Sequence, residues 1–347
     1  MAIIEPVIGR TIKRKLYTLS GKKLPFIAGH KLLYTCNLRC DMCPFWRRKD
    51  EKLLSLDDEI KMMDALASAG VSFMGFEGGE PLLRNDLEDI LRESHRRFHT
   101  SLVSNGWLLK NRASSIARYL DYLFVSIDGR KETHDDQRGV VGSFDHTIEG
   151  IKEAKKYVPV AMSTTITTKN MDDIKYVVNL AEELRVGINI QVSYDYSTAD
   201  KLSPDRQKLY NLLLDLKKMK EDGAPIVNSR EYFETLVNSW YYGIQWACKP
   251  WSTVNIDPQG RIVMPCYVLN EYAGDKKVWE TDIRNLWNTY DWKPYESCNK
   301  CSLSCYLEPS IFSWTSIQML NRPLKRQHTK YTSYPSNFHA WVFAFVH

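Results

Sequence analysis

Six short apolar runs alternate with longer segments of helical periodicity over the first 195 residues of the chain. A single helix between consecutive strands implies that the strands pair in parallel and are joined by right-handed crossovers. The repeats therefore predict an α/β fold, a partial (βα)6 barrel that resembles a TIM barrel but is not closed by eight strands. Functional side chains in such a barrel lie where the strands end. The predicted strands are residues 31–34, 71–76, 100–105, 121–128, 160–168 and 186–195.

The segment from 55 to 70 shows how clearly some helices are marked. Ser55 can cap the N-terminus of a helix, with Asp58 three residues later in the position of a capping-box acid. Gly70 suits the position just after the last turn. The expected apolar stripe of this helix consists of Leu56, Ile60, Met63 and Ala67.

The chain has eight cysteines, and they form two groups separated by about 200 residues. In a reducing compartment, cysteines that cluster in this way are more often metal ligands than disulfide partners. The alternative is that some of them are ordinary buried thiols. The first group is Cys36, Cys40 and Cys43, directly after the first predicted strand, and the second is Cys248, Cys266, Cys298, Cys301 and Cys305.

Composition and charge narrow the class of protein. The 347 residues are 44% hydrophobic with a net charge of +5, which does not argue for a nucleic-acid partner. No apolar run reaches the 18 or more residues that a membrane-spanning helix needs. The N-terminus lacks the apolar core and cleavage site of a secretory signal. We therefore expect a cytoplasmic protein.

Five regions are expected along the chain. Residues 3–19 read as a basic amphipathic helix, which either docks on the protein's own core, binds anionic lipid at a membrane surface, or lines a greasy substrate channel. The predicted regions are the N-terminal helix (1–25), the barrel (26–200), connecting helices (201–244), a small irregular cysteine-rich domain (245–315) and an aromatic tail (316–347).

Four motifs occur in order at the predicted strand ends. The pattern C-x3-C-x2-C follows the first strand, EGGEPLL the second, SNG the third and SIDG the fourth, before HDDQRGVVGSFDHTIEGI. Over residues 25–195 this order resembles the radical S-adenosylmethionine (SAM) superfamily. The resemblance implies that Cys36, Cys40 and Cys43 hold three irons of a [4Fe–4S] cluster, and that SAM occupies the fourth iron. Reductive cleavage of SAM then yields a 5′-deoxyadenosyl radical that abstracts hydrogen from an unactivated carbon.

The same resemblance suggests roles for other residues. Gly78 and Gly79 allow close backbone approach to the methionyl end of SAM, and Glu80 accepts a hydrogen bond from its ammonium group. Met42 stands where the family commonly has an aromatic residue near the adenine. The expected ribose or carboxylate contacts are Asn105, Ser126, Asp128 and Arg138, for which a purely structural role in turns is the alternative.

The second cysteine group surrounds a predicted hairpin at 251–266. This arrangement resembles the C-terminal SPASM and shortened twitch extensions of radical SAM enzymes, which hold auxiliary clusters. Five cysteines imply one auxiliary [4Fe–4S] cluster, and Cys248, Cys266, Cys298 and Cys301 match the shortened pattern best. Cys305 is an alternative ligand that could replace a neighbour. A zinc ribbon is the competing interpretation.

The predicted function is that of a radical SAM enzyme that modifies an unactivated C–H position. The N-terminal helix and the LSGKKLPF segment resemble those of the radical SAM enzyme that attaches adenosyl to hopanoid lipid, which favours a membrane-lipid or isoprenoid substrate. The alternative is a maturase of ribosomally made peptides or proteins. A non-catalytic iron–sulfur or zinc scaffold is the alternative from another class. The expected partners are SAM and a ferredoxin or flavodoxin reductant. A peripheral contact with a membrane through residues 3–19 is also expected.

Overall fold

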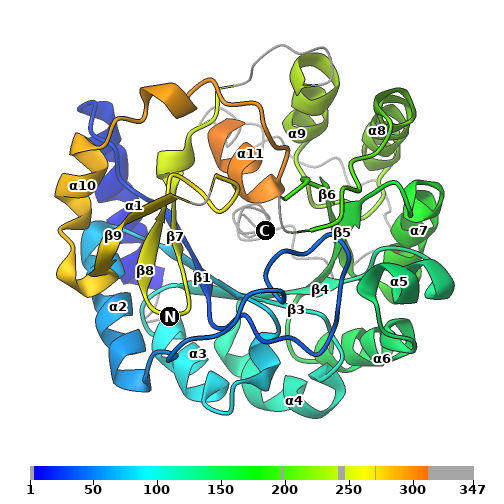
Figure 1. Cartoon of the computed structure of the whole chain (residues 1–347), viewed down its shortest axis with the longest axis horizontal. Helices are drawn as coiled ribbons and strands as arrows, with labels where there is room; N and C mark the ends of the chain where they lie inside the picture. Colours follow the sequence, from blue (N-terminus) through cyan, green and yellow to red (C-terminus); the bar gives the residue numbers. More distant parts are fainter. Residues whose placement is uncertain (1–3, 197–198, 241–246, 270, 312–347) are drawn as a thin grey trace.

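The computed structural model describes residues 4–196, 199–240, 247–269 and 271–311. It contains one nine-stranded sheet in the order β6-β5-β4-β3-β2-β1-β7-β8-β9, which curves around a central space with helices outside it (Figure 1). The strands are β1 (Ile27–Lys31), β2 (Phe73–Glu77), β3 (His99–Ser104), β4 (Tyr122–Ser126), β5 (Val160–Ile166), β6 (Gly187–Val192), β7 (Thr253–Ile256), β8 (Arg261–Met264) and β9 (Glu271–Lys277). The helices are α1 (Ile4–Leu19), α2 (Leu56–Ala69), α3 (Leu87–His95), α4 (Leu109–Ile116), α5 (Lys131–Arg138), α6 (Ser143–Ala154), α7 (Ile174–Leu184), α8 (Arg206–Glu221), α9 (Arg230–Thr235), α10 (Ile283–Thr289) and α11 (Ser304–Ile311).

Strands β1 to β6 pair in parallel, so the predicted partial barrel is confirmed. The position of the first strand was wrong, because β1 ends at Lys31 where 31–34 was expected. Residues Tyr34 and Thr35 donate their backbone N–H groups to the Asp50 carboxylate at 2.5 and 2.8 Å instead of to a neighbouring strand. The chain therefore leaves the sheet three residues earlier than expected and enters the cysteine loop.

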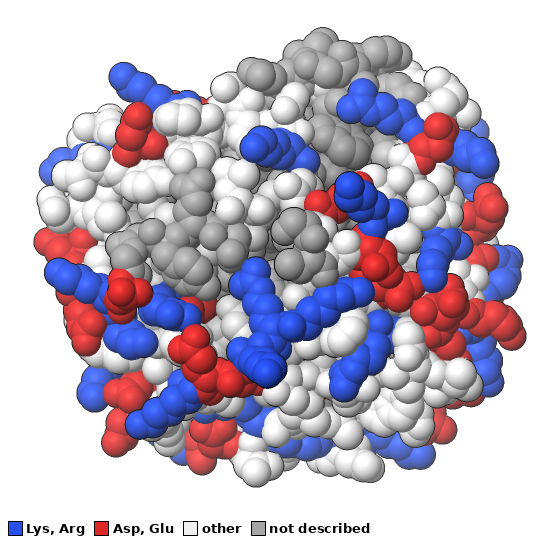
Figure 2. Space-filling model, viewed as in Figure 1, with Lys and Arg blue, Asp and Glu red and all other residues white. Residues whose placement is uncertain are grey.

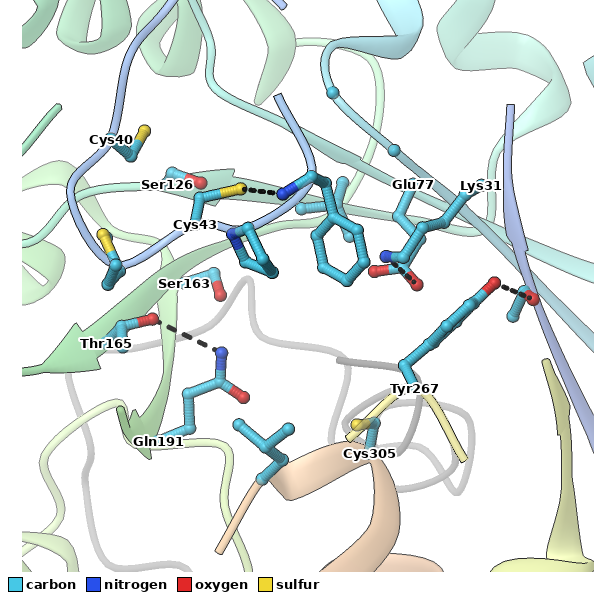
Figure 3. A pocket seen from close by; sticks show the side chains of 18 of the residues that line it. Lys31, Cys40, Cys43, Glu77, Ser126, Ser163, Thr165, Gln191, Tyr267 and Cys305 are labelled. Carbon is cyan, nitrogen blue, oxygen red and sulfur yellow. Dashed lines mark hydrogen bonds and ion pairs between the residues drawn. The ribbon is translucent and has the colours of Figure 1, made fainter. Parts of the chain in front are cut away.

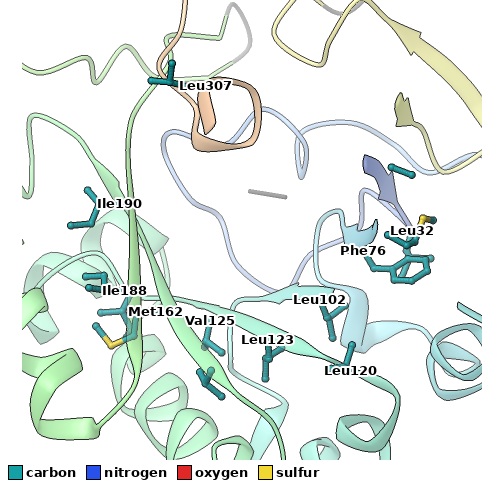
Figure 4. Packing of buried hydrophobic residues seen from close by; sticks show 14 of the residues in the cluster. Leu32, Phe76, Leu102, Leu120, Leu123, Val125, Met162, Ile188, Ile190 and Leu307 are labelled. Atoms are coloured by element: carbon teal, nitrogen blue, oxygen red, sulfur yellow. The ribbon is translucent and has the colours of Figure 1, made fainter. Parts of the chain in front are cut away.

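The main core lies between the sheet and the outer helices. Leu102, Leu123, Val125 and Met162 point from successive strands toward those helices (Figure 4). A second apolar cluster includes Ile27, Phe73, Tyr122 and Phe124, with Val103 packed against it. Ile27 and Val103 also line the central cavity, so this cluster forms part of its floor.

The C-terminal hairpin was predicted at the right residues, but it is not a separate sheet. Strand β7 pairs in parallel with β1, with Gly29 opposite Asn255, and β8 then pairs with β7 in the antiparallel sense. Helix α11 bridges the two ends of the parallel part of the sheet. Asn189 of β6 donates to the Ser304 hydroxyl at 3.2 Å, and the Tyr306 hydroxyl donates to Asn255 of β7 at 3.0 Å. The cysteine-rich region therefore closes one side of the barrel.

Helix α1 packs on the body of the protein through basic side chains. Arg14 lies over the Phe26 ring at 4.7 Å and donates to the Leu24 carbonyl at 3.3 Å, while Arg10 donates to the Arg97 carbonyl. Leu16 and Leu19 near its end are 63% and 75% exposed. Arg10 and Arg14 therefore dock this helix on the protein itself, as one of the three alternatives expected.

Other surface features bear on the remaining predictions. No described helix is long and apolar enough to span a lipid bilayer. On the face shown in Figure 2, basic and acidic side chains are interspersed around the rim, as the small net charge suggests. Helices α8 and α9 lie within the predicted connecting region, and the predicted aromatic tail (316–347) lies outside the described residues.

Candidate functional site

A cavity of about 240 Å³ lies at the carboxyl ends of the parallel strands. All three cysteines of the first group line it, together with strand-end residues of β1 to β7. Figure 3 shows Cys40 and Cys43 on one side of this cavity and Lys31, Glu77 and Tyr267 on the other. Cys305 also lines it, whereas the other four cysteines of the C-terminal group do not. The cavity therefore lies at the end of the barrel where enzymes with this fold carry their functional residues.

Each sulfur of the first group accepts a hydrogen bond. The N–H groups of Leu38 and Phe45 donate to Cys36 and Cys43, both at 3.4 Å, and the Arg138 guanidinium donates to Cys40 at 3.7 Å. Such donors stabilise thiolates and tune the potential of iron–sulfur clusters. Burial, partly offset by the Leu38 and Asn105 donors, raises the pKa of the Cys36 thiol to about 11. One buried and two partly buried thiols on one loop, each with an N–H donor, fit a cluster that takes three protein ligands.

The turn after β2 holds the cysteine loop through its two glycines. A Cβ at Gly78, where φ is +148°, would lie 2.4 Å from the Leu33 carbonyl oxygen, and one at Gly79 would lie 2.1 Å from that of Thr35. The Gly79 N–H donates to Leu33 at 2.8 Å, and the Glu80 N–H donates to Thr35 at 3.0 Å. Both glycines line the cavity, but the close approach that requires them is to the chain just before Cys36.

Glu80 lies fully buried behind the cavity wall and is not among the lining residues. Its carboxylate accepts hydrogen bonds from the Asn105 N–H at 2.7 Å, the Leu82 N–H at 3.0 Å and the Ser104 hydroxyl at 3.0 Å. Burial raises the pKa of Glu80 to about 7, although these three donors lower it. In this structure the carboxylate therefore organises the end of β3, and the cavity-lining carboxylate on this segment is that of Glu77.

The other residues expected to contact SAM fall into two sets. Met42, Asn105, Ser126 and Arg138 line the cavity, and the Asn105 amide donates to the Cys36 sulfur at 3.8 Å. Asp128 is fully buried and does not line it. Its carboxylate accepts from Arg138 at 2.6 Å, so it orients the guanidinium that reaches Cys40.

The C-terminal cysteines approach one another closely enough to interact electrostatically. Burial raises the pKa of Cys248, and the charges of Cys301, Cys266 and Cys298 raise it further. Burial also raises the pKa of Cys305, and the charges of Glu77, Cys301 and Cys266 raise it further while Lys31 lowers it, so Cys305 lies between the other cysteines and the cavity. Among the described residues, no three His, Cys, Asp or Glu side chains gather closely enough to hold a single metal ion.

Several cavity residues were missed by the sequence interpretation. Lys31 is almost fully buried, forms an ion pair with Glu77 at 2.9 Å, and lies 3.7 Å from the centre of the Phe45 ring and 4.3 Å from that of Tyr267. Asn255 of β7 faces the same region. Lys31 and Glu77 are the last residues of β1 and β2, so the strand-end rule could have selected them once the strand limits were known.

Two family models match the chain. One, described as the radical SAM superfamily, matches residues 31–181, and the other, a domain of unknown function (DUF3463), matches residues 188–324. Fe-coproporphyrin III synthase of Methanosarcina barkeri is 32% identical over 178 residues, covering 49% of this chain and 44% of that protein. PqqA peptide cyclase of Granulibacter bethesdensis is 24% identical over 300 residues, 78% of each chain. The chain spans about half the length of the first of these relatives.

Solved structures extend the likeness beyond the barrel. Streptococcus suis SuiB bound to S-adenosylmethionine has a TM-score of 0.63 at 16% identity, covering 80% of this chain and 69% of that chain. The anSMEcpe structure with bound AdoMet and the Cp18Cys peptide has a TM-score of 0.59 at 19% identity, covering 80% and 86%. At these identities the likeness establishes the fold, including that of much of the C-terminal region. The radical SAM superfamily model therefore matches residues 31–181, and the fold of this chain resembles those of SuiB and anSMEcpe.

Proposed function

We propose that this chain is a radical SAM enzyme that modifies an unactivated C–H position of a peptide or protein substrate. The observation that carries the proposal is the meeting of Cys36, Cys40 and Cys43 with the ends of the parallel strands around one cavity. The match of residues 31–181 to the radical SAM superfamily model supports the SAM chemistry. PqqA peptide cyclase among the relatives and SuiB with its bound precursor peptide support the substrate class. These comparisons favour the peptide alternative over the lipid substrate that the N-terminal resemblance suggested.

The residues of the chain would divide the work as follows. Cys36, Cys40 and Cys43 hold the cluster, and the Arg138–Asp128 pair fixes a donor against the Cys40 sulfur. When bound, the cluster and SAM supply one-electron cleavage of the sulfonium bond and the 5′-deoxyadenosyl radical. The apolar floor and the buried strand ends exclude water from the cavity, which protects a radical from side reactions.

SAM would lie against the cysteine side of the cavity. The backbone of Gly78 and Gly79, the Asn105 amide and the Ser126 hydroxyl are the groups there with polar atoms for its methionyl and ribose parts. Met42 offers a soft apolar contact for the adenine. Glu80 acts indirectly, by holding the end of β3 that carries Asn105.

An auxiliary [4Fe–4S] cluster would use Cys248, Cys266, Cys298 and Cys301. These four match the shortened pattern and do not line the cavity. Cys305 remains outside this set and presents its thiol to the cavity. It is therefore the cysteine that we expect to be dispensable for iron binding.

The test is the formation of 5′-deoxyadenosine by the anaerobically reconstituted and reduced protein in the presence of SAM. The wild type should form it, and Cys40→Ala should not, because one of the three cluster ligands is missing. Cys305→Ala is the matched control and should cleave SAM at close to the native rate. A wild type that binds iron without cleaving SAM would favour a non-catalytic scaffold, and zinc in place of iron would favour a zinc ribbon. Reduced flavodoxin or ferredoxin in place of dithionite tests the expected electron donor.

A further inference from the structure

The side of the cavity away from the cysteine loop contains a notch at Gly29. Gly29 lies on β1, which pairs with β2 on one side and with β7 on the other. A Cβ built on Gly29 would lie 3.8 Å from the Asn255 amide oxygen, 3.9 Å from a Glu77 carboxylate oxygen and 4.0 Å from the Tyr267 ring. The missing side chain therefore leaves a space with an amide on one wall, a carboxylate on the opposite wall and an aromatic ring beside them.

The amide wall presents a donor that has no partner among the described residues. The backbone N–H of Tyr267 donates to the Tyr306 hydroxyl at 2.9 Å, and that hydroxyl donates in turn to the Asn255 side-chain oxygen at 3.0 Å. The Asn255 Oδ1 is therefore already paired within the protein. The Asn255 Nδ2 is buried without a hydrogen-bond partner within the described structure, in a residue only 3% exposed. A buried donor left unpaired is unfavourable, so its presence in a cavity points to a ligand acceptor.

The carboxylate wall presents an acceptor. Glu77 accepts from the Lys31 ammonium at 2.9 Å, and Lys31 is held in turn over the Phe45 and Tyr267 rings. An ionised carboxylate has about four acceptor positions. Among the described residues, Lys31 is the donor to this carboxylate, which leaves capacity for a donor from a ligand.

We propose that this notch recognises a secondary amide group, as in a peptide bond of the substrate. In a planar trans peptide the C=O and N–H groups point in opposite directions. Such a group between the two walls would accept from Asn255 Nδ2 on the β7 side and donate to Glu77 on the β2 side. An anionic headgroup would meet the Glu77 carboxylate with the wrong sign of charge. The inference rests on the proposed function for its substrate class, and it adds the chemical group recognised and the residues that recognise it.

The experiment measures binding of a peptide-bond mimic to the reconstituted full chain by saturation-transfer NMR, without reductant. The probes are N-methylacetamide, methyl acetate, which lacks the N–H, and acetate, which is anionic. N-methylacetamide should bind the wild type most tightly, and its affinity should fall about tenfold in Asn255→Leu, as expected for loss of one hydrogen bond. Gly29→Ala fills the notch at ordinary contact distances and should abolish this binding while leaving the fold intact.

Three outcomes would overturn the inference. They are equal binding by wild type and Gly29→Ala, equal binding of the amide and the ester, and preferential binding of acetate. Uncoupled SAM cleavage is measured on the same variants. If the wild type fails to cleave SAM, the proposed function is wrong. If SAM cleavage is native but Gly29→Ala binds the amide as tightly as the wild type does, only the inference about the notch is wrong.

Discussion

One added methyl group at Gly79 tests whether the turn after β2 sets the position of the cysteine loop. An ideal Cβ there would lie 2.1 Å from the Thr35 carbonyl oxygen and 2.4 Å from that of Tyr34. Real Cβ contacts are essentially never below 3.0 Å, so the shorter distance has to grow by about 0.9 Å. Both oxygens belong to the backbone directly before Cys36 and cannot turn aside as the end of a side chain would.

We therefore expect Gly79→Ala to displace the start of the cysteine loop by about 1 Å. A misplacement of that size can reduce a rate about 100-fold. The assay is 5′-deoxyadenosine formation by the anaerobically reduced protein, with iron per chain measured on the same sample. Gly9→Ala in α1 is the matched control, because no atom of the described residues lies within 4 Å of the added Cβ, and its rate should be native.

A Gly79→Ala protein with native rate and native iron content would refute this reasoning, since the loop would then tolerate the displacement or avoid it. A slow protein with full iron would mean that the loop still holds the cluster but positions it poorly. A slow protein without iron would mean that the three thiols no longer converge. Both of the latter results agree with the close approach seen here.

Three further changes test other parts of the structure. Asp128→Asn leaves Arg138 buried without its counter-ion, so the free energy of unfolding in urea should fall by about 3–5 kcal/mol, and an unchanged value would contradict the pairing. Burial raises the pKa of Glu308 to about 7 from its ordinary 4.5, although donors from Ser229 lower it. Protonated Glu308 therefore stabilises the fold fully below pH 4.5, and this contribution is lost as the pH rises through 7. Glu308→Gln should therefore flatten the fall in urea midpoint over that range, and an equally steep fall would exclude Glu308 as its source. Cys301→Ser should lose about four irons per chain while Cys305→Ser keeps them, and the reverse result would reassign the auxiliary ligands.

The local signals in the sequence predicted much of the barrel. Ser55 caps α2 by accepting from the Asp58 N–H at 3.3 Å, and Gly70 ends that helix with φ +108°. Both depend only on neighbours in the chain. The predicted apolar stripe was wrong in part, because α2 buries Glu59 and leaves Ile60 only partly buried. Glu59 forms an ion pair with Arg84 at 3.0 Å and lies 3.1 Å from His30, and such long-range polar contacts have no local signature.

The site was predictable in its ligands but not in its supports. The spacing of Cys36, Cys40 and Cys43 at a strand end was enough to bring them to one cavity. The sequence motif could not indicate that Glu80 faces the end of β3, because that depends on how neighbouring strands pair. The same holds for the hairpin, whose two strands are local but whose pairing of β7 with β1 joins residues more than 200 positions apart. Asn255 enters the cavity only through that pairing.

The central claim is that Cys36, Cys40 and Cys43 hold an iron–sulfur cluster with one iron open to SAM. Electron paramagnetic resonance of the anaerobically reduced full chain, recorded with and without SAM, tests it most directly. We expect SAM to shift part of the cluster signal in the wild type, and Cys40→Ala to abolish this SAM-sensitive part while the signal assigned to the auxiliary cluster remains. An iron–sulfur signal that SAM leaves unchanged in the wild type would contradict the claim.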